Sequence, residues 1–76
     1  GSRDRAMSRV SETLKSLNPL ELSDLDGIRA VFGDGWMLFR PSGTEPKLKI
    51  VVEAESKEAA DRLLEKAMDI GKEAVK

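Results

Sequence analysis

Two segments of this chain, residues 27–32 and 47–55, alternate between apolar and polar side chains. An alternation of period two is typical of a β-strand that has one buried and one solvated face. In the first segment, Ile28, Ala30 and Phe32 share one face. In the second segment the apolar face consists of Leu48, Ile50, Val52 and Ala54. The pattern therefore predicts that the fold is built on a half-buried sheet.

Short turns connect these strands to their neighbours in the sequence. Gly33-Asp34-Gly35 is a hairpin signal, and residues 36–40 are the expected return strand. Residues 20–26 are short and mixed, so they are either a weak edge strand or an extended loop. Because short connections join antiparallel rather than parallel strands, the sequence favours an antiparallel sheet.

A helical period appears on both sides of the strands. Residues 3–17 place apolar side chains on one stripe and end at Asn18-Pro19, because the residue before a proline avoids helical geometry. Residues 57–75 follow Ser56, a plausible N-cap, and Glu58 and Arg62 are spaced for an i,i+4 pair. The predicted stripe of this second helix is Ala60, Leu63, Leu64, Ala67, Ile70, Gly71 and Ala74. The expected fold class is α+β, a two-layer structure with both helices on one face of an antiparallel sheet.

Composition limits the kinds of function that such a chain can have. Its 76 residues suffice for one small domain, expected over residues 3–76, with residues 1–2 interpreted as an expression scar. The net charge of -1 argues against a nucleic-acid partner. No apolar run approaches the roughly 18 residues of a membrane span, and the N-terminus is too polar for a signal peptide, so we expect a cytoplasmic protein without a membrane partner. Without cysteine or histidine, binding is favoured over catalysis.

The segment Arg40-Pro41-Ser42-Gly43-Thr44-Glu45-Pro46 has the chemistry of a phosphate cradle. Its two prolines stiffen both shoulders, while Gly43 lets a ligand approach the backbone. Ser42 and Thr44 supply hydroxyl donors, and successive backbone N–H groups around the glycine can form an anion nest. Arg40 offers a planar fork for phosphate oxygens, and Lys49 can add a second cation. Glu45 would repel an anion and is expected to orient a cation or a backbone N–H group.

Simpler interpretations remain open for each of these features. Proline, serine, glycine and threonine are ordinary turn residues, so the segment could be a plain hairpin loop. The carboxylates near Asp26-Gly27 are too few for a metal site and are typical of a turn. Trp36 could stack on a sugar, but a strand tryptophan is more often a core residue. Glu53 and Glu55 are expected on a solvated or interdomain face.

Residues 36–50, with the core Arg40-Pro41-Ser42-Gly43-Thr44-Glu45-Pro46, closely resemble the C-terminal signature of the α-D-phosphohexomutases. That family includes phosphoglucomutase, phosphomannomutase and phosphoglucosamine mutase. The resemblance extends over nearly the whole chain and implies the family's fourth domain, with a TATA-binding-protein-like fold. It further implies that the loop binds the non-transferring phosphate of a phosphosugar. The matching positions are Arg40, Ser42, Gly43, Thr44 and Lys49, although many members have arginine where this chain has Lys49.

The resemblance also implies what this domain does not do. The family's phosphoserine loop, its D-G-D-x-D-R magnesium loop and its sugar-binding loop have no counterpart in the sequence. The expected domain therefore has no catalytic residue, no metal site and no cofactor of its own. Magnesium is expected in the parent enzyme, and the other domains of that enzyme are expected partners. An alternative is a non-enzymatic α+β module that binds a protein partner.

Overall fold

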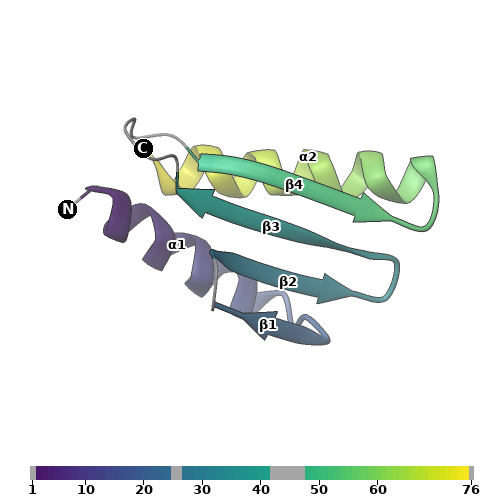
Figure 1. The fold of residues 1–76 in the computed structure, drawn as a ribbon, viewed down its shortest axis with the longest axis horizontal. Coiled ribbons are helices and arrows are strands. Elements are labelled where there is room, and N and C mark those ends of the chain that lie inside the picture. The colour runs from purple at the N-terminus through teal and green to yellow at the C-terminus, as the bar shows by residue number, and fades with distance from the viewer. Residues whose placement is uncertain (1, 25–26, 42–47, 76) are drawn as a thin grey trace.

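A computed structural model describes residues 2–24, 27–41 and 48–75 of the chain. The elements follow in the order α1 (Ser2–Ser16), β1 (Glu21–Ser23), β2 (Ile28–Phe32), β3 (Gly35–Pro41), β4 (Leu48–Ala54) and α2 (Lys57–Ala74). The strands form an antiparallel sheet in sequence order, with β1 and β4 at its edges. Figure 1 shows both helices behind this sheet. The predicted two-layer α+β fold is confirmed, and the alternative of a weak edge strand is met by β1.

The core lies between the sheet and the two helices. Cross-strand register places Ala30 opposite Met37, and Phe39 between Ile28 and Ile50. Met37 and Phe39 on β3 are fully buried, as are Val10 and Leu14 on α1. Because the alternation predicted which side of each strand is apolar, the core face of β2 and β4 is the expected one.

The end of α1 follows from Asn18 and Pro19. The N–H groups of Leu17 and Asn18 donate to the carbonyls of Leu14 and Lys15, which tightens the last turn. Asn18 has a φ of 54°, a left-handed conformation that asparagine tolerates better than most residues after a helix. The chain then turns into β1, where Leu20 N–H donates to Val31 on β2.

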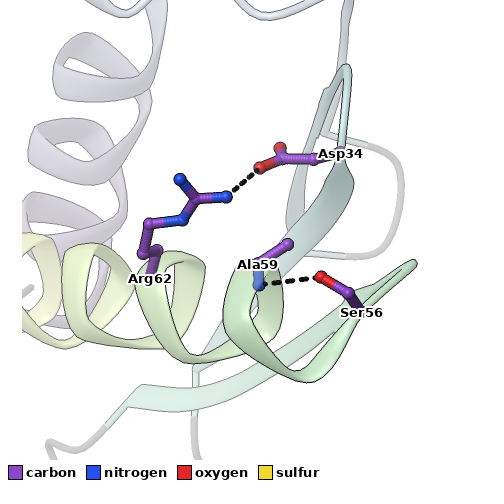
Figure 2. Close-up of polar contacts among 4 residues, drawn as sticks. All are labelled: Asp34, Ser56, Ala59 and Arg62. Atoms are coloured by element: carbon purple, nitrogen blue, oxygen red, sulfur yellow. Dashed lines mark hydrogen bonds and ion pairs between the residues drawn. The ribbon is translucent and has the colours of Figure 1, made fainter.

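The second helix begins as the sequence predicts. The Ser56 side chain accepts a hydrogen bond from Ala59 N–H at 3.1 Å, which satisfies one orphan donor of the first turn (Figure 2). The predicted apolar stripe is wrong in its first half, because the buried residue is Ala59 rather than Ala60 and Leu64 is 44% exposed. The buried face of α2 is formed by Ala59, Leu63, Ala67, Ile70, Gly71 and Ala74. It is narrower than predicted because only the side of α2 that faces the sheet and α1 is covered.

Gly71 explains how α2 approaches β4 so closely. A Cβ atom at this position would lie 3.0 Å from the Cδ1 atom of Ile50, closer than most carbon–carbon contacts. Glycine within a helix costs roughly 1 kcal/mol relative to alanine. Here the missing side chain lets α2 pack more closely against the sheet, which offsets part of that cost.

The second face of the sheet, here called the outer face, carries Arg29, Val31, Trp36, Leu38, Arg40, Lys49, Val51 and Glu53. In the part of the chain that the structure describes, neither helix packs on this face (Figure 1). The interpretation of Trp36 as a core residue is wrong, because it alternates with Met37 and so points away from the helices. The guanidinium of Arg29 lies over its ring, 5.0 Å from the centroid. Trp36 is therefore a half-buried surface residue held by a cation–π contact.

The β2–β3 turn is tied to α2 at the end of the sheet where that helix begins. The guanidinium of Arg62 lies 3.6 Å from the Asp34 carboxylate, as Figure 2 shows. The predicted pairing of Arg62 with Glu58 is replaced by this tertiary contact. Asp34 also accepts a backbone hydrogen bond from Glu55 N–H. Among the described residues, neither helix is long and apolar enough to cross a membrane.

Candidate phosphate-binding site

The base of the candidate site is the open end of the β3–β4 hairpin. Arg40 lies directly opposite Lys49, and Pro41 lies opposite Leu48. Residues 42–47 join the two strands beyond this last pair. Both Arg40 and Lys49 are exposed and belong to the outer face of the sheet. Strand pairing thus brings Arg40 and Lys49 side by side, although eight residues lie between them in the sequence.

The structure bears on only part of the predicted cradle. Arg40 and Lys49 are described, and the register brings them together. Ser42, Gly43, Thr44 and Glu45 fall outside the described residues, so the roles predicted for them stay predictions. The hairpin that carries the loop is the expected one.

Electrostatics distinguish this end of the hairpin from an ordinary turn. Opposed residues on antiparallel strands have Cβ atoms about 5 Å apart, and like charges at such positions destabilise the sheet. A dianion bound between Arg40 and Lys49 would turn this repulsion into two attractions. The register thus places two cations side by side at the end of the hairpin.

In the sequence, Gly27 is distinguished only by the Asp26-Gly27 turn signal and by its place at the start of the strand predicted over residues 27–32. The structure places it immediately before Ile28, which pairs with Phe39, so Gly27 lies across from Arg40. A Cβ atom at Gly27 would lie 2.7 Å from the Cγ atom of Arg40. The Asp26-Gly27 pair before a strand is the sequence signal that marks this glycine. Its position beside Arg40 follows only from the register of β2 and β3.

The remaining candidates do not form a second site of comparable chemistry. In residues 2–24, 27–41 and 48–75, no group of three or more acidic side chains is placed to hold a metal ion. Glu53 lies opposite Trp36 and is exposed on the outer face, as expected for a solvated position. A hollow between the two helices is lined by Arg9, Glu12, Thr13, Glu73 and Ala74. There Arg9 donates to the Ala74 carbonyl at 3.5 Å, a contact that joins the two helices.

Comparison with known proteins places this chain in a family. Residues 4–70 match the family described as the phosphoglucomutase/phosphomannomutase C-terminal domain. A probable phosphoglucosamine mutase of Thermococcus gammatolerans is 51% identical over 95% of this chain and 16% of its own length. A probable phosphoglucosamine mutase of Pyrococcus abyssi is 45% identical over 91% of this chain and 16% of its own. The phosphoglucosamine mutase of Methanocaldococcus jannaschii is 41% identical over 96% of the chain and 16% of its own.

The chain spans about a sixth of the length of these curated relatives. Its match to the family covers most of the described structure, from α1 through the hairpin to the greater part of α2. The sequence resemblance to the phosphohexomutases is confirmed: this chain belongs to the family of phosphoglucomutase/phosphomannomutase C-terminal domains.

Proposed function

We propose that this domain binds the phosphate group of a phosphosugar on behalf of a phosphohexomutase. The single observation that carries the proposal is the opposition of Arg40 and Lys49 at the base of the loop formed by residues 42–47. Two exposed cations at adjacent cross-strand positions supply positive charge of the kind that binds a phosphate group. Family membership gives this chemistry a substrate class, since the relatives are named as mutases of phosphorylated sugars.

In the proposed complex, each group has a distinct role. The planar guanidinium of Arg40 contacts two phosphate oxygens, and the Lys49 ammonium adds a point charge at the rim. The hydroxyl groups of Ser42 and Thr44 and the backbone N–H of Gly43 complete the cradle. No group of this domain breaks or forms a bond, so the domain holds and orients its ligand while the phosphoryl transfer occurs elsewhere in the parent protein.

The names of the relatives support a proposal about which phosphosugar the parent protein binds. The three relatives are named phosphoglucosamine mutase, so we include in the proposal that the phosphosugar is a glucosamine phosphate. The full enzyme would interconvert the 6-phosphate and the 1-phosphate through a bisphosphorylated intermediate. The sugar then turns over within the cleft, and the same loop holds either phosphate in turn. Magnesium belongs to this proposal only as a group that other domains of the parent enzyme would hold.

A phosphate titration followed by NMR tests the proposal. Glucosamine 6-phosphate is added to the ¹⁵N-labelled chain at constant ionic strength, and unphosphorylated glucosamine is the matched ligand control. Amide shifts are expected at Arg40, at Lys49 and in residues 42–47, with a millimolar Kd because a single loop contributes few charge-assisted hydrogen bonds. Lys49→Gln should weaken binding several-fold. Lys57→Gln removes an exposed lysine that begins α2, and it should leave Kd unchanged. Equal responses to both ligands would exclude phosphate recognition.

One observation favours a second candidate function, that of a protein-binding module. Val31, Trp36, Leu38 and Val51 are half-buried apolar side chains, and they are neighbours on the outer face. A partner protein could pack on this patch. That alternative predicts no response of the hairpin loop to phosphate, so the same titration separates the two functions.

A further inference from the structure

Arg40 has a different neighbour on each side within the sheet. On the β4 side it faces Lys49, and on the β2 side it faces Gly27, the residue before the first paired position of β2. Lys49 carries a long charged side chain, whereas Gly27 carries none. On the β2 side, the missing side chain of Gly27 therefore leaves space beside the arginine stem.

The distances around Gly27 indicate how closely the two residues approach. A Cβ atom there would lie 2.5 Å from the carbonyl oxygen of Phe39, 2.7 Å from the Cγ atom of Arg40 and 3.4 Å from its Cα atom. The first methylene groups of Arg40 thus lie against the glycine backbone. The first two of these separations are shorter than ordinary van der Waals contact, so any other residue at this position must displace either the β3 backbone or the arginine.

The backbone of Gly27 adds a second restriction. Its φ of 81° lies in the left-handed region, which glycine adopts without steric cost. The chain needs this conformation to enter β2 beside the end of β3. Both the dihedral angle and the contact with Arg40 therefore require glycine, and they act at the end of the sheet where β3 ends and β4 begins.

We infer that Gly27 is a positioning residue for the phosphate-binding arginine. It provides the space in which the Arg40 stem lies, and so sets the position from which the guanidinium extends. This inference rests on the proposed function, because it gives Gly27 a role only if Arg40 contacts phosphate. Gly27 does not itself touch the ligand through a side chain.

The test compares three glycine-to-alanine variants. Gly27→Ala introduces the clash with Arg40. Gly35→Ala introduces an equally severe one at the far end of β3, where the new Cβ would lie 2.4 Å from the Glu53 carbonyl oxygen. Gly33→Ala meets no atom within 4 Å. We expect Gly27→Ala and Gly35→Ala to lower the midpoint of urea unfolding, and Gly33→Ala to leave it nearly unchanged.

Binding of inorganic phosphate separates positioning from general destabilisation. Measured at a temperature where each variant is folded, the Kd of Gly27→Ala should rise about tenfold, because the charge-assisted hydrogen bonds of Arg40 are lost. The Kd of Gly35→Ala should match the unaltered chain. The ¹⁵Nε resonance of Arg40 should shift on phosphate addition in the unaltered chain and respond weakly in Gly27→Ala. An unchanged Kd in folded Gly27→Ala would overturn the inference and leave the proposed function standing.

Two results on the unaltered chain bear on the inference even if the Gly27→Ala variant does not fold. If that variant does not fold, nuclear Overhauser effects between the Gly27 Hα and Arg40 Hγ protons of the unaltered chain decide the question. Their presence with and without phosphate supports the inference, and their absence overturns it. If the unaltered chain does not respond to phosphate, the proposed function fails and the positioning role fails with it.

Discussion

Arg40 and Lys49 face each other across β3 and β4, one residue pair before the loop of residues 42–47. The arrangement places two exposed cations where strand pairing alone would favour opposite charges. It is the feature of the described structure that most directly supports an anion-binding role.

Neutralising Arg40 or Lys49 should relieve the repulsion between them in the absence of phosphate, and it should weaken phosphate binding. We expect Arg40→Gln and Lys49→Gln to show an unfavourable coupling free energy of about 0.2–1 kcal/mol in a double-mutant cycle without phosphate. The repulsion should nearly vanish in 1 M salt, where the Debye length is about 3 Å. Urea unfolding at low and high salt measures the coupling. A favourable coupling in phosphate-free buffer would contradict the proposed role of this end of the hairpin.

The two large aromatic residues of β3 should differ sharply in their contribution to stability. Phe39 is fully buried between sheet and helices, so Phe39→Ala should cost about 3–5 kcal/mol, enough to unfold much of so small a domain. Trp36 lies on the outer face with Arg29 over its ring, so Trp36→Ala should cost only about 1 kcal/mol. Far-UV circular dichroism in urea reports both variants, since it does not depend on the tryptophan. Similar costs would mean that the outer face is packed more tightly than described.

The N-cap of α2 should contribute measurably to stability. Ser56→Ala removes the acceptor for Ala59 N–H and should lower the free energy of unfolding by about 1 kcal/mol. Ser56→Asp should restore most of it, because the carboxylate also accepts this bond and interacts favourably with the helix dipole. The matched control is Ser8→Ala on the exposed side of α1, where alanine has the higher helix propensity and should stabilise slightly. Thermal unfolding of the three variants distinguishes capping from a general effect of losing a hydroxyl group.

The ion pair of Asp34 and Arg62 should be weak. Its atoms are 3.6 Å apart, and the Arg62 side chain is 74% exposed, so solvent screens the attraction. A double-mutant cycle of Asp34→Asn and Arg62→Gln should give a favourable coupling below about 1 kcal/mol that falls in 1 M salt. A salt-independent coupling above that value would show that the pair is better shielded than its exposure indicates.

Local patterns were sufficient for most of the secondary structure. The alternation around Ile28 and Ile50 predicted two strands and their buried faces, because a two-residue period has only one geometric solution. Asn18-Pro19 and Ser56 predicted a helix end and a helix start, because capping depends on neighbouring residues. The motif from Arg40 to Pro46 predicted the family, which the comparisons confirm.

Tertiary structure decided the features that depend on which elements pack together. Trp36 and Leu64 are apolar residues in regular elements, and only the placement of both helices on one sheet face leaves them partly exposed. Arg62 pairs with Asp34 because the turn between β2 and β3 reaches α2. The position of Gly27 beside Arg40 likewise follows from strand register, which the sequence does not specify residue by residue. The sequence by itself therefore determined the elements and the family motif, whereas packing and register decided which residues surround the arginine of that motif.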